Sequence, residues 1–473
     1  MFALLAVYAL FGISMPRAGG DYIYVSRGLN SFVGFVNAFA LAAGYMVANG
    51  MYAIFYPQYL GYQLSTVGIV DHMPSMVALG SLIIQPTPAF TIAMVIGILG
   101  CVMALLRPKY CWATIFWTGV ISLICTVIMY VTLATISPAT FQAAYDNFVT
   151  NNGAYLSGLG LTNATTYQQT ITAGGWTAPT SVMAATLAAF PIALYSFTWS
   201  MLPTSWSGEI KRVQRSLPLV LLGGMLFLFA YYVLLMQLST GAFGQAFMTS
   251  WSALSTNPSY PLMATLSDYI PFFAYLVYHN PIILWAMFVA LWFPAIFSFA
   301  PLLVASVRYL FAWSFDRVLP EKISSVSERS HTPIIATVLA FLVNVAGMAI
   351  EAFDPAAMPA ILVPIFIFGY LLPALTGIVF PYLKRDLYES SFIVKRKVAG
   401  IPILTWAGLV SFVALAIGTY SIFASGLYPM LLPDYIFYGL AYGLGVVIFV
   451  VAYVVRKNSG ADLLLSFKAI PPE

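Results

Sequence analysis

The chain has 473 residues, of which 61% are hydrophobic and 7% are charged. This composition excludes an ordinary soluble domain, in which roughly a quarter of the residues are charged. The three cysteines, Cys101, Cys111 and Cys125, all lie in apolar stretches, so they indicate neither a disulfide framework nor a metal site.

Apolar stretches long enough to cross a bilayer predict an all-α polytopic membrane protein with eleven spans. The predicted spans are 1–15, 31–56, 89–106, 111–136, 183–204, 216–239, 282–312, 333–351, 358–383, 401–425 and 433–455. We expect 137–182 to be an extracellular loop. Segment 240–281 fits either an ordinary loop or a short helix over an outer cavity.

All nineteen Lys and Arg residues fall in alternate connections or at their edges. They are Arg17, Arg27, Arg107, Lys109, Lys211, Arg212, Arg215, Arg308, Arg317, Lys322, Arg329, Lys384, Arg385, Lys395, Arg396, Lys397, Arg456, Lys457 and Lys468. The positive-inside rule places these connections and the C-terminus in the cytoplasm, as in a multi-pass protein of the cell membrane. Eleven spans then put Met1 outside, so we expect a further helix before Met1, making twelve.

Three segments carry a motif. The first is Met15-Pro-Arg-Ala-Gly-Gly-Asp-Tyr-Ile-Tyr24; the second is Tyr195-Ser-Phe-Thr-Trp-Ser200 with Ser207-Gly-Glu-Ile-Lys211; the third is Arg308-Tyr-Leu-Phe-Ala-Trp-Ser-Phe-Asp316-Arg-Val-Leu-Pro320. In order and spacing they resemble the amino acid–polyamine–organocation (APC) superfamily of permeases, over nearly the whole chain. Residues 1–15 then match the second helix of the family, which agrees with an absent first helix.

The resemblance implies a leucine-transporter-like fold of 5+5 inverted repeats. Residues 1–136 would form the first repeat without its leading helix, and 183–383 the second repeat with a broken helix near 195–200. Residues 384–473 would supply two additional helices and a short cytoplasmic tail.

The predicted span 183–204 carries several hydroxyl residues between Pro191 and Pro203. Irregular backbone inside a membrane is tolerated where it lines a cavity, and transporters use such broken helices to bind their substrates. The alternative is a kinked helix whose hydroxyls bond back to its own carbonyls. The candidate substrate-binding residues are Tyr195, Ser196, Phe197, Thr198, Trp199, Ser200, Asn37, Tyr45, Trp292 and Ser298, although the last four could instead join helices. The family commonly has Gly where Trp199 stands, so the substrate differs from a standard amino acid or sits differently.

Charged residues at the cytoplasmic ends of neighbouring helices suggest an inner gate. The candidates are Asp21, Glu209, Lys211, Arg308 and Asp316. The alternative is a set of solvated interfacial charges, which contribute little energy. The sequence leaves the coupling ion, proton or sodium, open, and it predicts neither a metal site nor a cofactor.

The leading interpretation is a secondary transporter that moves an amino acid, amine or related small organic solute by alternating access. A non-transporting substrate sensor on the same fold is the first alternative. A membrane-embedded transferase is the second, although the chain has only three scattered histidines. The expected partners are the solute and the lipid bilayer, with no nucleic acid, in a monomer or homodimer.

Overall fold

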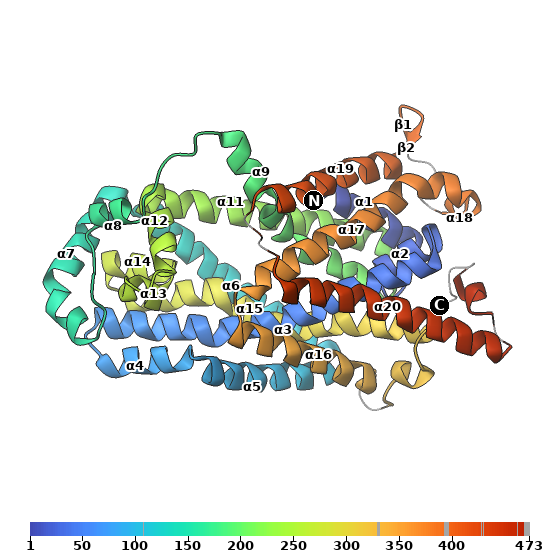
Figure 1. Ribbon diagram of the computed structural model, residues 1–473, viewed down its shortest axis with the longest axis horizontal. Helices are drawn as coiled ribbons and strands as arrows, with labels where there is room; N and C mark the ends of the chain where they lie inside the picture. Colours follow the sequence, from blue (N-terminus) through green and yellow to red (C-terminus); the bar gives the residue numbers. More distant parts are fainter. Residues whose placement is uncertain are drawn as a thin grey trace.

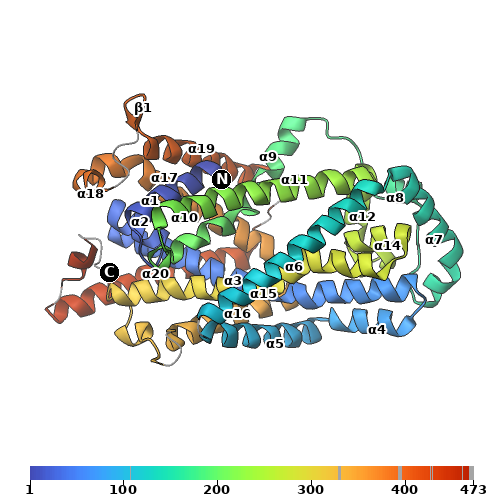
Figure 2. The same ribbon diagram turned by 180° about the vertical axis from the view of Figure 1, so that it is seen from behind.

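The computed structural model describes residues 1–106, 108–328, 332–391, 397–426, 428, 430–460 and 462–467, with residues 108, 294–297 and 433 described by their backbone alone. Among the basic residues, Arg107, Arg329, Lys395, Arg396 and Lys468 lie outside the described residues. The described part is an elongated bundle of helices (Figure 1, Figure 2), in which the strands are the two-residue antiparallel pair β1 (Lys397–Val398) and β2 (Ile401–Pro402).

Ten helical segments of the described chain are long and apolar enough to cross a membrane. They are α3 (Ser31–Val70), α5 (Pro86–Leu105), α6 (Pro108–Thr135), α9 (Val182–Tyr195) with the 3₁₀ helix η1 (Thr198–Ser205), α10 (Val213–Pro218) with η3 (Leu219–Gly223) and α11 (Gly224–Phe243), α15 (Pro281–Phe315), α16 (Ile334–Phe353), α17 (Ala357–Leu383), α19 (Ile403–Ala424) and α20 (Leu432–Asn458). The eleventh predicted span is α1 (Phe2–Ser14), a 13-residue helix. The prediction of an all-α polytopic membrane protein is therefore confirmed.

Shorter helices connect these spans. They are α2 (Asp21–Gly28), α4 (Pro74–Ile83), α7 (Pro138–Gly158), α8 (Tyr167–Ala173), η2 (Ser207–Glu209), α12 (Gln245–Ser255), α13 (Pro261–Leu266), α14 (Ile270–Tyr278), η4 (Glu321–Ser324), α18 (Arg385–Glu389) and η5 (Leu463–Phe467). The segment 137–182 thus contains two helices, and 240–281 contains three, so its helical alternative holds.

Helix α3 is much longer than the span predicted for it. With 40 residues it extends about 60 Å, roughly twice the thickness of the hydrocarbon core. The predicted end at residue 56 is wrong because Pro57 lies inside the helix. The extension also buries polar side chains, and Gln63 Oε1 accepts a hydrogen bond of 2.7 Å from the hydroxyl of Tyr269, the residue that precedes α14.

The C-terminal part of α3 packs against a helical cap, which we define as α7, α8 and α12–α14. Both views place the cap at one end of the bundle (Figure 1, Figure 2). Its core is a separate cluster of buried aromatic rings that includes Phe141, Tyr145, Phe247, Trp251 and Phe273. Packing of these rings stabilises the cap, in which α8 and α12–α14 are too short to form alone.

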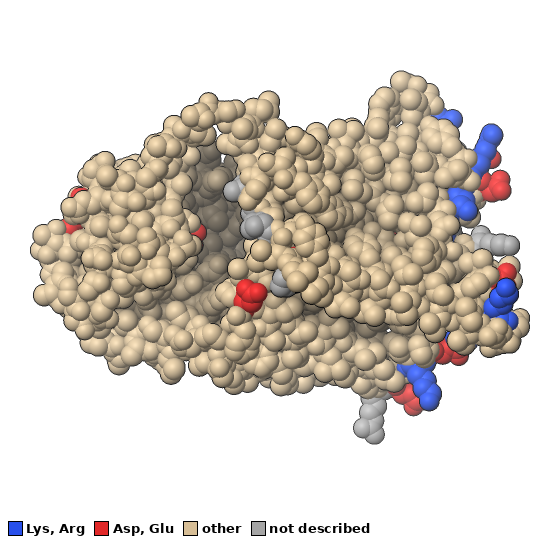
Figure 3. Space-filling model, viewed as in Figure 1, with Lys and Arg blue, Asp and Glu red and all other residues tan. Residues whose placement is uncertain are grey.

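The end opposite the cap carries the basic residues. In Figure 3 the visible Lys and Arg side chains gather at that end, which we call the basic end. Helix α3 runs from the basic end to the cap, whereas α15 starts beside the cap and ends at the basic end (Figure 1). These two long helices are therefore antiparallel and form the axis of the bundle.

Candidate functional site

The helical backbone changes its form in the middle of the segment Val182–Ser205. Helix α9 ends at Tyr195, Ser196 and Phe197 form a turn, and the chain continues as the 3₁₀ helix η1. The carbonyl oxygen of Thr198 accepts a hydrogen bond of 2.8 Å from the Tyr370 hydroxyl on α17. A side chain from another helix thus satisfies a backbone group at this break, as a low-dielectric environment requires.

The hydroxyl groups at the break bond locally. Ser196 Oγ donates to the carbonyl of Ile192 at 2.9 Å, and Thr198 Oγ1 donates to that of Tyr195 at 2.8 Å. Ser200 Oγ is buried and has no partner among the described residues. Hydroxyl groups that bond back to carbonyls of their own helix, the alternative to a broken helix, thus occur here together with the change in backbone form.

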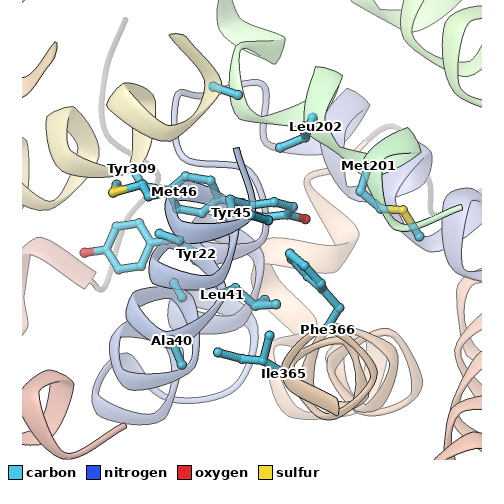
Figure 4. Close-up of a cluster of buried hydrophobic side chains, with 14 of the residues drawn as sticks. Tyr22, Ala40, Leu41, Tyr45, Met46, Met201, Leu202, Tyr309, Ile365 and Phe366 are labelled. Atoms are coloured by element: carbon cyan, nitrogen blue, oxygen red, sulfur yellow. The ribbon is translucent and has the colours of Figure 1, made fainter. Parts of the chain in front are cut away.

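A cluster of aromatic side chains surrounds the break. The hydroxyls of Tyr45 and Tyr370 are hydrogen-bonded, and those of Tyr52 and Tyr195 lie 2.5 Å apart. The indole N–H of Trp199 donates to the Tyr52 hydroxyl at 3.3 Å. In Figure 4, Tyr45 lies at the centre with Phe366 below and to the right of it, Leu202 above it and Met201 to the right.

A cavity of about 710 Å³ opens beside this cluster, between α3, α6, α9, α11 and α15. Figure 3 shows one face of the molecule hollowed between the cap and the middle of the bundle. Among the described residues, the cavity wall is mostly aromatic and hydroxylic and contains no charged side chain. Its lining includes Tyr52, Phe55, Tyr59, Tyr195, Ser196, Trp199, Tyr231, Tyr232, Trp292 and Ser298.

Half of the predicted substrate-binding residues lie on this wall, namely Tyr195, Ser196, Trp199, Trp292 and Ser298. Trp292 stacks on Tyr59, which holds its ring against α3. Ser298 is hydrogen-bonded to the Tyr56 hydroxyl. The wall is therefore assembled from residues far apart in the sequence.

The other candidates lie elsewhere. Tyr45 and Thr198 are buried in the aromatic cluster, with 2% and 1% of their surfaces exposed. Asn37 donates to the carbonyl of Gly369 at 2.9 Å, which joins α3 to α17 in the manner of a helix-packing residue. Phe197 packs against Tyr232 on α11.

A buried ion pair lies at the basic end. Arg27 Nη2 lies 2.6 Å from Asp316 Oδ1, and the two side chains are 0% and 3% exposed. The Tyr22 hydroxyl donates to the other carboxylate oxygen at 2.6 Å, and Arg27 also lies over the ring of Phe467. This pair joins α2 to the end of α15, so it must break before these helices can separate.

A second buried carboxylate, Asp21, lies nearby at the first residue of α2. It accepts hydrogen bonds from the Tyr309 hydroxyl at 2.6 Å and from the Tyr8 hydroxyl at 3.4 Å. The backbone amide of Tyr22 also donates to it at 3.1 Å. Burial raises the pKa of Asp21 to about 6, and the hydrogen bonds from Tyr309, Tyr22 and Tyr8 oppose this shift in part.

The remaining gate candidates are more exposed than this buried cluster. Arg308 Nε is 2.7 Å from Glu209 Oε1, but the Glu209 side chain is 56% exposed. Lys211 is exposed, and within the described part of the chain it forms no ion pair. The structure thus brings Asp21 and Asp316 into one buried cluster, pairs Glu209 with Arg308, and leaves Lys211 apart.

Four residues of the buried cluster were not among the predicted gate residues, namely Tyr8, Tyr22, Arg27 and Tyr309. Tyr22 belongs to the first motif, which Arg27 follows, so their sequence position was a usable signal. Tyr309 lies in the third motif.

The two glycines of the first motif bring the turn after α1 against η1. Gly19 and Gly20 have φ angles of +103° and +52°, which side chains other than glycine rarely adopt. The Gly19 amide donates to the carbonyl of Ser205 at 3.0 Å, and Ala18 bridges to Trp206. The turn at the basic end therefore contacts the end of the segment that borders the cavity.

A comparison with known families finds a match. The sequence profile of a family described as "Amino acid permease" matches residues 1–451. The chain belongs to this permease family. A search of curated proteins finds no match.

Membership makes this permease a membrane transporter of amino acids or related solutes, with a small-molecule substrate and a lipid environment. Among the described residues of the permease, no group of three or more His, Cys, Asp and Glu side chains lies close enough to hold a metal ion.

Proposed function

We propose that the permease is a secondary transporter that moves an amino acid, amine or related small organic solute across the cell membrane by alternating access. The observation that carries this proposal is the break between α9 and η1, which lies on the wall of the aromatic cavity. Backbone irregularity inside a membrane span is expected where it lines a substrate site.

We further propose that residues 1–136 and 183–383 form two inverted repeats. The helix directions support this arrangement, because each helix of the first unit runs opposite to its counterpart in the second: α3 to α15, α5 to α16 and α6 to α17 (Figure 1, Figure 2). Two units of opposite orientation around one site allow the same contacts to open toward either side. The α19–α20 pair, with the tail, lies outside this scheme.

In this proposal the basic end faces the cytoplasm, as the positive-inside rule predicts. The cavity lies on the cap side of the buried pair between Arg27 and Asp316, so the structure would have its cytoplasmic side closed. Transport then requires Arg27, Asp316 and the turn at Gly19 to move apart from their partners.

The substrate would contact Tyr195, Ser196 and Trp199 at the break, and Trp292 and Ser298 across the cavity. The uncharged wall offers aromatic faces, hydroxyls and an indole N–H. Aromatic faces attract organic ammonium groups and stack on flat side chains, so either kind of solute is compatible with this wall.

Uptake by purified permease in proteoliposomes tests the proposal, with a panel of labelled amino acids and amines. We expect saturable uptake of at least one solute, strongly reduced by Trp199→Ala. The matched control is Trp117→Ala, because Trp117 is 63% exposed on the outer surface of α6.

Saturable binding without uptake would refute transport and favour the sensor alternative. If the permease neither binds nor takes up any solute of the panel, the function proposed for the cavity is refuted. Equal loss in the Trp199 and Trp117 variants would place the substrate elsewhere.

A further inference from the structure

Two buried carboxylates lie at the basic end, and they differ in how their charge is compensated. Asp316 has the guanidinium of Arg27 at 2.6 Å. Asp21, with 1% of its surface exposed, is held by the hydroxyls of Tyr309 and Tyr8 and by a backbone amide. A buried charge without a counter-ion is costly, and a carboxyl can avoid that cost by binding a proton.

Within the described part of the chain, the titratable side chains that interact with Asp21 are tyrosines, and they come from five helices. Tyr8 lies on α1, Tyr24 on α2, Tyr45 on α3, Tyr309 on α15 and Tyr370 on α17. Among the described residues, no Lys, Arg or His forms an ion pair with Asp21. Its pKa of about 6 lies in the range where the carboxyl changes charge near neutral pH.

Asp21 is also connected to the break beside the cavity. The ring of Tyr309, its closest donor, lies 6.2 Å from that of Tyr45. The Tyr45 hydroxyl is bonded to Tyr370, which in turn donates to the carbonyl of Thr198. Tyr309, Tyr45 and Tyr370 therefore form a continuous chain of contacts between Asp21 and the α9–η1 break.

We propose that Asp21 is a proton-binding site, and that its protonation loosens the contacts that close the basic end. The ionised carboxylate can accept from Tyr8 and Tyr309 at the same time, and such charge-assisted bonds are stronger than neutral ones. The proton would occupy one of the two carboxylate oxygens, so the contact there would weaken or be lost. The consequence for the gate rests on the transport function proposed above, whereas proton binding itself does not.

The proton site is tested directly by infrared difference spectroscopy of the purified permease between pH 8 and pH 5. We expect a C=O stretching band of a protonated carboxyl that grows with a midpoint near pH 6. The band should be absent in Asp21→Asn and retained in Glu209→Gln, which removes an exposed carboxylate. A band that is unchanged in Asp21→Asn would overturn the proposal.

Tyrosine variants keep the test informative if Asp21→Asn does not fold. Tyr309→Phe removes a donor that favours the ionised form, so the midpoint should move to higher pH. Tyr8→Phe removes a longer bond and should shift the midpoint less, and Tyr453→Phe on α20 should leave it unchanged. Equal midpoints in all three variants would contradict the assignment.

The gate is tested by labelling a cysteine at Ser205, which is buried against the Gly19 turn. The three native cysteines are replaced by alanine in the background protein. With a pKa of about 6, the protonated fraction of Asp21 falls from about 90% at pH 5 to about 1% at pH 8. We expect the labelling rate, corrected for the pH dependence of the thiol reaction itself, to fall between pH 5 and pH 8. The fall should be at most the ratio of these two protonated fractions.

In Asp21→Asn the labelling should stay fast at every pH, because the neutral amide mimics the protonated acid. Labelling that is independent of pH in the otherwise unaltered protein would overturn the link to the gate. Neither measurement uses a substrate. Failure of uptake with an intact titration would therefore refute transport alone, and loss of the titration with intact uptake would refute the proton site alone.

Discussion

Replacing Asp316 by asparagine should destabilise the permease by about 3–5 kcal/mol, the usual cost of removing one partner of a buried ion pair. The substitution keeps the size of the side chain and removes its charge. Arg27, whose side chain is 0% exposed, is then left without its counter-ion.

The remaining contacts of Arg27 do not replace the carboxylate. Its Nη1 donates to Ser26 Oγ at 2.8 Å, and its guanidinium lies 4.9 Å from the ring centre of Phe467. A cation–π contact of this kind contributes about 0.5–2 kcal/mol. The Tyr22 hydroxyl, which donates to Asp316 at 2.6 Å, would retain only a neutral acceptor.

Thermal unfolding of the purified protein in detergent, followed by tryptophan fluorescence, measures this effect. The matched control is Glu389→Gln, which breaks the exposed pair with Arg385 and should change stability by less than about 0.5 kcal/mol. The double variant Arg27→Leu with Asp316→Leu should lose less than the sum of its single variants, because no unpaired charge remains. If Asp316→Asn is as stable as Glu389→Gln, the assignment of this pair as the closing contact is refuted.

Two further substitutions test the helix packing and the break. Gly50→Ala would place a Cβ atom onto the carbonyl oxygen of Asn344, so α3 and α16 must separate, and we expect a loss of about 1–3 kcal/mol in thermal unfolding. Gly439→Ala on α20 meets open space and should leave stability unchanged or raise it by up to about 1 kcal/mol, because alanine favours the helix. Equal stability of the two variants would contradict the packing. Tyr370→Phe removes the donor to the buried carbonyl of Thr198 and should cost about 1–3 kcal/mol while raising the KM for uptake; an unchanged melting temperature and KM would show that this bond does not support the break.

The membrane spans could be predicted from the sequence because their hydropathy is a local property. The end of α3 could not, since Pro57 signals a helix end but is accommodated inside a longer helix. Hydropathy did not reveal the cap helices, because α7 is rich in polar residues and the other cap helices are short. Their stability comes from rings such as Phe141 and Phe273, which meet only in the folded chain.

The candidate site was predictable to a similar extent. Hydroxyl residues between Pro191 and Pro203 indicated an irregular span, and the backbone changes form within it. The pairing of Arg27 with Asp316 could not be derived, because the two residues are 289 positions apart and topology allows several partners at that end. Lys211 and Arg308 are both basic gate candidates, and the fold pairs Glu209 with Arg308.

The most direct test of a substrate site at the α9–η1 break is solute protection of a cysteine introduced at Ser196, which is exposed to the cavity. In proteoliposomes without native cysteines, a solute that the permease takes up should slow labelling at this position. The same solute should leave unchanged the labelling of a cysteine at Ser157, on the exposed surface of the cap. A transported solute that does not affect labelling at position 196 would contradict the account.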